Sequence, residues 1–263
     1  MVIRIGTSGF QYEDWREILY PRDLPKTRFL ERYAEEFDSV EINYTYYSMP
    51  SARTLASLVR RTPGPFGFAI KLHSTMTHER TADDAAYRAF LEALRPLVDG
   101  GRLLAILGQF PQSLWPDAAA REHLERLRER FRDLPLVYEF RNKRWIRDEV
   151  RRWLRALRVG YCCVDQPQLP SLVPAVLWVT SPVGYVRLHG RNTEKWYEHE
   201  DAAERYDYRY STQELGEWKD RVRRLAQKAE TTLVYFNNHF RGNAVHNARE
   251  LRGLLGGQGG SRQ

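Results

Sequence analysis

Short hydrophobic runs alternate along this chain with longer segments in which hydrophobic residues recur at helical spacing. We interpret the runs as β-strands, because they are short and end in glycine, proline or polar residues. The predicted strands span residues 2–7, 39–43, 66–71, 103–109, 136–141, 161–165, 185–189 and 232–237. The run LLAILGQ at 103–109 is hydrophobic almost throughout, which is typical of a strand buried on both faces of a parallel sheet.

The segments between these runs predict helices, from hydrophobic spacing or from a capping residue at the start. The predicted helices span residues 27–37, 51–61, 83–100, 116–132, 148–157, 212–228 and 243–255. Strand and helix alternate about eight times without a linker or a shift of composition, as a (β/α)8 barrel requires. We therefore predict an α/β fold, a single-domain TIM barrel over residues 1–255, followed by a flexible Gly-rich tail over 256–263.

Polar residues recur at the C-terminal ends of the predicted strands, and this favours the barrel over a doubly wound open sheet. In YVRLHGR, at 185–191, the side chains of Tyr185, Arg187 and His189 share one face of the strand. An open sheet gathers ligand contacts near one switch point, whereas a barrel brings every strand end to one mouth. The polar residues expected around that mouth are Glu41, Asn43, Lys71, Gln109, Glu139, Arg141, Asp165, Arg187, His189 and Asn237.

Composition and charge restrict the class of protein. The 263 residues are 42% hydrophobic and 13% aromatic, which is enough for a substantial core. The net charge of +7 favours anionic partners, although arginine-rich helices such as 121–132 account for much of it without a ligand. Cys162 and Cys163, the only cysteines, are adjacent, so no disulfide framework forms and a cytoplasmic location is expected. No hydrophobic run approaches ~18 residues, so we expect neither a membrane span nor a signal peptide.

A set of motifs, taken in order along the chain, resembles the DUF72 family, which is also called the YecE-like family. The motifs are IGTSGF, VEINYTYYSMP, FAIKLHSTMTHER, GQFP, YEFRNKRW, VDQP, YVRLHGRN and YFNNHFRGNAVHNARELRGLL. The resemblance covers almost the whole chain. It implies a TIM barrel with a motif-rich face and no established biochemical activity. Nuclease or DNA-binding roles follow only by analogy with endonuclease IV and xylose isomerase-type barrels, because fold does not fix function.

The first functional hypothesis is an enzyme, of nuclease or phosphoesterase type, that acts on a phosphate-bearing substrate such as a nucleic acid or a nucleotide. Glu41 or Glu139 would be the general base and His189 the acid, with Asp165 as a further catalytic carboxylate. Arginine binds phosphate in bidentate fashion, and Arg191 in the adjoining loop would leave an excess of positive charge. The residues expected to bind the substrate are Asn43, Lys71, His78, Gln109, Arg141, Arg187, Arg191, Asn237 and Asn238.

Other interpretations of the same residues stay open. The mouth residues could form a closed ion-pair network that only stabilises the barrel. The protein could be a non-catalytic nucleic-acid-binding barrel, or a sugar-active isomerase- or glycosidase-like barrel. The loop 191–210 mixes aromatic and charged residues and is either a lid or a nucleic-acid contact. We predict no metal and no cofactor, because the histidines lack ligand spacing and cations lie among the candidate ligands.

Overall fold

The computed structural model describes residues 2–256 and has eight parallel strands arranged around a barrel. The strands follow the chain in the order β1 (Val2–Thr7), β2 (Ser39–Ile42), β3 (Gly67–Lys71), β4 (Leu103–Phe110), β5 (Leu136–Phe140), β6 (Gly160–Asp165), β7 (Val183–Leu188) and β8 (Thr231–Phe236). Hydrogen bonds join them in the order β1-β8-β7-β6-β5-β4-β3-β2. The predicted single-domain TIM barrel is therefore confirmed, whereas the predicted tail lies, from residue 257 on, outside the described residues.

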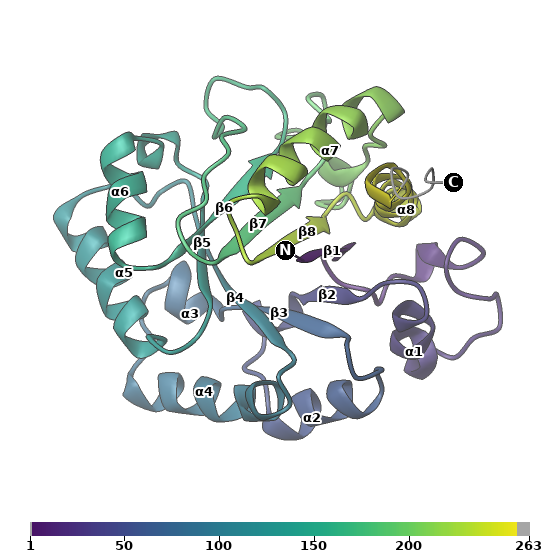
Figure 1. The fold of residues 1–263 in the computed structure, drawn as a ribbon, viewed down its shortest axis with the longest axis horizontal. Helices are drawn as coiled ribbons and strands as arrows, with labels where there is room; N and C mark the ends of the chain where they lie inside the picture. Colours follow the sequence, from purple (N-terminus) through teal and green to yellow (C-terminus); the bar gives the residue numbers. More distant parts are fainter. Residues whose placement is uncertain (1, 257–263) are drawn as a thin grey trace, which may run out of the picture.

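The helices lie outside the ring of strands (Figure 1). They are α1 (Phe29–Ala34), α2 (Ala52–Arg60), α3 (Ser74–Thr77), α4 (Asp84–Asp99), α5 (Ala118–Arg130), α6 (Asp148–Ala156), α7 (Thr212–Ala226) and α8 (Asn243–Gly256). The side chains of Ser51, Asp83 and Asp117 cap α2, α4 and α5 by accepting the backbone N–H of the third residue of each helix. The Pro-rich connection 166–182, between β6 and β7, contains no helix.

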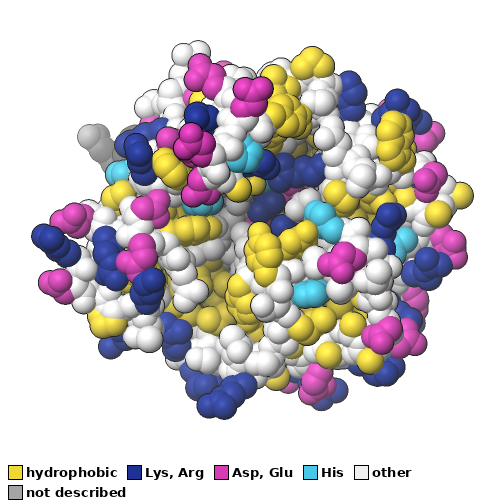
Figure 2. Space-filling model, turned by 180° about the vertical axis from the view of Figure 1, so that it is seen from behind, with side chains coloured by type: hydrophobic (Ala, Val, Ile, Leu, Met, Phe, Trp, Pro, Cys, Tyr) yellow, Lys and Arg dark blue, Asp and Glu magenta, His cyan; other side chains and the backbone are white. Residues whose placement is uncertain are grey.

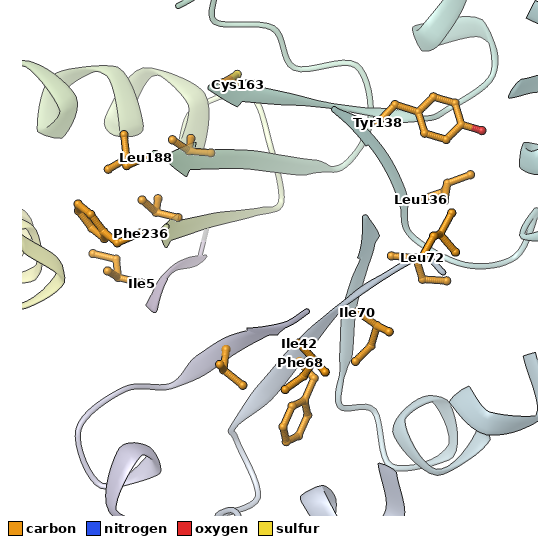
Figure 3. Packing of buried hydrophobic residues seen from close by; sticks show 14 of the residues in the cluster. Ile5, Ile42, Phe68, Ile70, Leu72, Leu136, Tyr138, Cys163, Leu188 and Phe236 are labelled. Carbon is orange, nitrogen blue, oxygen red and sulfur yellow. The ribbon is translucent and has the colours of Figure 1, made fainter. Parts of the chain in front are cut away.

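Side chains on each strand divide between two hydrophobic environments. The outward-facing set packs between the strands and the helices, and Figure 3 shows Ile42, Ile70, Tyr138 and Phe236 on this side. A second, smaller cluster fills the inside of the barrel with Ala69, Ala105, Leu107, Val137, Cys162, Val164, Tyr185, Leu233 and Tyr235. The interior is therefore a packed core, as is usual for this fold, and ligands can enter only at an end.

The barrel is joined less regularly between β1 and β2 than elsewhere. The backbones meet in a single bridge, in which Gly9 N donates to Glu41 O at 2.8 Å. A Cβ at Gly6 would lie 2.1 Å from Ser39 O, so only glycine fits there. The hydroxyl of Tyr33, on α1, accepts from Thr7 N at 2.9 Å and donates to Ser39 O at 3.1 Å. This phenol replaces the missing ladder between the two strands, and burial raises its pKa so that it keeps the donated proton.

We expect Tyr33→Phe to destabilise the barrel by about 1–3 kcal/mol, because it leaves the buried N–H of Thr7 and C=O of Ser39 without this partner. Equilibrium unfolding in urea measures the change. Tyr47→Phe removes the same atom from a side chain that is 79% exposed, so it should change the stability by less than ~0.5 kcal/mol. Equal stabilities for the two variants would show that the phenol does not hold β1 to β2.

Candidate functional site

Arg187 extends from β7 into the barrel interior, where it binds two buried carboxylates. Its Nη2 lies 2.8 Å from Glu41 Oε1, and its Nη1 lies 2.8 Å from Glu139 Oε2. Both carboxylates are fully buried, and only 3% of the Arg187 side chain is exposed. The phenol of Tyr185 donates a 2.7 Å hydrogen bond to the other oxygen of Glu41. One guanidinium thus joins β2, β5 and β7 through the inside of the barrel.

This pairing changes the expected roles of Arg187 and Glu139. The sequence analysis placed Arg187 against a ligand anion, whereas its two Nη atoms are occupied by carboxylates of the protein itself. Burial alone would raise the pKa of Glu139, but the guanidiniums of Arg141 and Arg187 hold that pKa well below its usual range. A general base works best with a pKa near the operating pH, so this environment does not favour Glu139 as a base.

Arg141 lies just beyond β5 and borders the open mouth. Its Nε is 2.6 Å from Glu139 Oε1, and its side chain is 18% exposed. Its Nη1 donates to Gln166 Oε1 at 3.3 Å, and its Nη2 lies 3.2 Å from Nε2 of His189. Glu139 and Gln166 therefore fix the guanidinium from below and from one side, while part of it stays accessible.

His189 follows β7 and is fully buried beneath the mouth. Burial, and then the charge of Arg141, lowers its pKa to about 3. Nδ1 is 3.0 Å from the Asn237 amide nitrogen, whereas Nε2 lies 3.2 Å from Arg141 Nη2 and 3.4 Å from Glu139 Oε1. An imidazolium would need an acceptor at Nδ1 as well, where Asn237 presents its amide nitrogen. His189 is thus neutral near neutral pH, and the expected role as an imidazolium acid does not fit this environment.

A cavity of about 350 Å³ opens at the mouth above these residues. It is lined by His78, Gln109, Gln112, Arg141, Leu172, Trp196, Tyr197, Arg205 and Tyr206. The lining contains two arginines and no carboxylate. Burial, followed by the charges of Lys71 and Arg141, lowers the pKa of His78 to about 4, so this imidazole is neutral as well. Figure 2 shows a hollow on one face of the molecule with Lys and Arg side chains inside it.

Lys71, at the end of β3, lies directly beside this cavity. Its Nζ donates a 3.0 Å hydrogen bond to Gln109 Oε1 and sits 4.3 Å from the centre of the Tyr46 ring. Within residues 2–256 its amine has no carboxylate at ion-pair distance. Burial, and then the charge of Arg187, lowers the pKa of Lys71 to about 7. The lysine therefore changes its charge near neutral pH.

Asp165 and Arg191 lie away from the mouth, contrary to expectation. Asp165 lies on the same outward-facing side of β6 as Cys163. Its carboxylate accepts a hydrogen bond from Nε1 of Trp218 on α7. Arg191 Nη2 lies 2.7 Å from Asp165, and its Nη1 lies 2.8 Å from Glu214. Arg191 is therefore neutralised by two carboxylates and adds no excess positive charge to the mouth. This pair instead attaches the start of the loop 191–210 to α7.

The predicted amide residues serve different purposes. Asn237 contacts His189 and stays within the mouth, and Asn43 lies at the end of β2 with its buried Oδ1 unpartnered. Asn238 donates to Tyr208 O at 2.8 Å and to Asn247 Oδ1 at 2.9 Å, so it organises the loop and α8. The structure thus brings most of the predicted residues together but assigns Asn238 to a supporting contact.

The loop 191–210 supplies cavity residues that the sequence analysis did not assign individually. Trp196 is 4% exposed, and the rings of Tyr206 and His189 are 6.4 Å apart. Arg205 lines the cavity and lies 6.0 Å from the Trp196 ring. The loop therefore packs on the rim of the barrel as a lid. The mixture of aromatic residues and cations in this loop was the only sequence feature that pointed to a role at the mouth. Because an irregular loop has no regular spacing of hydrophobic residues, the sequence could not show which of its side chains face the cavity.

Two further features concern only the part of the chain that the structure describes. Between residues 2 and 256, no three side chains of His, Cys, Asp or Glu gather in a group that could hold a metal ion. No helix in that range is long and apolar enough to cross a membrane.

We expect Arg187→Met to reduce stability by about 3–5 kcal/mol, because it leaves the buried Glu41 without a cation and Glu139 with Arg141 alone. Denaturant unfolding measures this loss. Replacing both carboxylates as well, with Glu41→Gln and Glu139→Gln, removes the stranded charges and should recover part of it. Arg88→Met, at an exposed position on α4, is the matched control. An Arg187→Met variant as stable as this control would contradict a paired, structural Arg187.

Proteins similar to this chain match it along nearly its whole length. The family described as "Protein of unknown function DUF72" matches residues 4–262. The UPF0759 protein YunF of Bacillus subtilis (strain 168) is 30% identical over 272 residues, which cover 97% of this chain and 95% of that protein.

Solved structures agree with this match. The crystal structure of a DUF72 family protein from Thermotoga maritima MSB8 has a TM-score of 0.89 and 36% identity, covering 97% of this chain and 99% of that one. One from Enterococcus faecalis V583 has a TM-score of 0.87 and 29% identity, covering 97% and 95%. On the family match and these likenesses, the chain belongs to the DUF72 family.

Proposed function

We propose that the cavity at the barrel mouth binds the phosphate group of a small substrate and that the protein is an enzyme acting on that substrate. The observation that carries this proposal is the charge of the lining, which contains Arg141 and Arg205 but no carboxylate. The nearby carboxylates Glu41 and Glu139 are buried and already paired with Arg187. The two arginines therefore attract an anion into the cavity, and no carboxylate of the lining repels it.

The lining offers donors suited to a phosphate group. Arginine binds phosphate through two parallel hydrogen bonds, and Arg141 is held in position by Glu139. Arg205 adds a second guanidinium to the lining. The amide of Gln109 can donate to a further oxygen. Lys71, beside Gln109, adds a positive charge whenever it is protonated.

A small ligand fits this geometry better than a nucleic acid laid across the mouth. The cavity volume of about 350 Å³ is at the lower end of the range for small-molecule sites. The loop 191–210 covers the rim and carries Glu198, Glu200, Asp201 and Glu204, which would repel a phosphate backbone. A nucleotide, or the end of a nucleic-acid chain, belongs to the proposed class of phosphate-bearing substrates. A glycosidase is disfavoured, because it needs two carboxylates free to act at a glycosidic bond.

Substituting Arg205 provides the direct test, because this residue belongs to the loop and not to the barrel core. We expect Arg205→Gln to weaken binding of pyrophosphate and of adenosine monophosphate by about tenfold or more, since a charged hydrogen bond contributes ~1.5–3 kcal/mol. Isothermal titration calorimetry measures the affinities. The control Arg88→Gln removes a charge from exposed α4 and should bind as the wild type does.

Two other results of that titration would count against the proposed phosphate site. Equal affinities of the wild type and Arg205→Gln for both ligands would contradict the proposed cavity. Strong binding of a single-stranded oligonucleotide that survives Arg205→Gln and weakens steeply with salt would instead favour the nucleic-acid-binding alternative.

The pH dependence of anion binding gives a second prediction. Lys71 gains a proton as the pH falls through about 7, so the cavity becomes more positive at lower pH. Sulfate keeps its charge over this range and is the appropriate probe. We expect sulfate affinity to fall as the pH rises from 6 to 8 in the wild type and in the control Lys143→Met. The variant Lys71→Met should lose most of this dependence, and an unchanged dependence would contradict the role of Lys71.

A further inference from the structure

Lys71 has the surroundings of a reactive amine rather than those of a structural cation. A lysine that serves only as a charge is usually paired with a carboxylate or extends into water. Lys71 does neither, because its Nζ contacts an amide oxygen of Gln109 and the face of Tyr46. The residue is still partly exposed and adjoins the cavity through Gln109. The amine is therefore held beside Gln109, a residue of the cavity wall, and within residues 2–256 it has no carboxylate at ion-pair distance.

We propose that Lys71 is a nucleophile that condenses with the carbonyl group of a phosphate-bearing aldehyde or ketone bound in this cavity. The inference rests on the proposed function, because binding of the phosphate at Arg141 and Arg205 is what would place the carbonyl carbon beside Lys71. It extends that function by naming a chemical class of substrate, a phosphorylated carbonyl compound, and a covalent intermediate with the protein.

Burial and the charges of Arg187 and Arg141 favour the neutral form of Lys71, whereas Glu139 and Glu41 act in the opposite direction. The charged and titratable groups around the amine come from several elements, namely Glu41, Tyr46, His78, Glu139, Arg141 and Arg187. The two carboxylates are engaged by Arg187 and Arg141, so neither forms an ion pair with Lys71, and the effects that lower its pKa prevail. With the pKa of Lys71 at about 7, about half of the molecules carry the free amine at neutral pH. Desolvation near other cations is a known way to activate a lysine.

The proposed step balances without any further reactant. The nitrogen lone pair of Lys71 forms a bond to the carbonyl carbon, and the electron pair of the C=O π bond moves to oxygen, which takes up a proton. The nitrogen loses a proton to water. Departure of the hydroxyl group as water, with one more proton, leaves the protonated imine, whose nitrogen keeps one hydrogen; loss of that proton to water gives the neutral imine. No oxidant or reductant is required, and addition of water reverses the step.

Reductive trapping tests this inference. The protein is incubated at neutral pH with glycolaldehyde phosphate and sodium borohydride, and modified lysines are identified by peptide mass spectrometry. An ordinary exposed lysine holds only on the order of a thousandth of its amine in the neutral form at this pH. We expect Lys71 to be modified at least tenfold faster than Lys143, with a rate that rises to a plateau above pH ~7. The variant Lys71→Arg should lose this adduct.

The same experiment separates the two proposals. Unphosphorylated glycolaldehyde should modify Lys71 at least tenfold more slowly, and excess pyrophosphate should protect Lys71 from the phosphorylated probe. Pyrophosphate binding that depends on Arg205, together with no preferential adduct at Lys71, would overturn the nucleophile and leave the proposed function standing. Rapid modification of Lys71 by both aldehydes alike, without protection by pyrophosphate, would support the reactive amine and contradict the phosphate site on which the substrate class rests.

Discussion

The pairing of Arg187 with Glu41 and Glu139 is the interaction on which the rest of the mouth depends. Two carboxylates in a barrel interior are costly unless a cation lies between them, and Arg187 reaches both at 2.8 Å. The three residues come from β7, β2 and β5, so their attraction also joins strands that are not neighbours in the sheet. Below them the interior is filled mainly by apolar side chains such as Leu107, Val137 and Leu233, and the ion pairs separate that cluster from the open end.

The electrostatics of the cavity follow from this arrangement. Because Glu41 and Glu139 are engaged by Arg187 and Arg141, they cannot neutralise the cations nearer the surface. Lys71 is left with an amide and an aromatic ring as its contacts. Burial and the charge of Arg141 lower the pKa of His189, so its imidazole stays neutral. The same pairing that stabilises the barrel therefore produces an anion-attracting cavity and a lysine whose pKa is about 7.

The fold and much of the site could be predicted from the sequence, but the partners within the site could not. Short hydrophobic runs ending in polar residues were sufficient to place Glu41, Lys71, Glu139 and Arg187 at strand ends. In a parallel barrel both faces of a strand are buried, so the pattern YCCVD does not show whether Asp165 faces inward or outward. Pairing between residues far apart in the chain, such as Arg187 with Glu41, likewise depends on barrel geometry that no local pattern contains.

The central claim is that the paired carboxylates leave Lys71 without a counterion at the mouth. A nuclear magnetic resonance titration of protein labelled with ¹³C at the lysine ε-carbons tests it most directly, with Lys71→Arg used to assign the signal. The Lys71 signal should titrate near pH 7, well below the ordinary value for an exposed lysine. Titration of Lys71 together with the surface lysines would contradict it.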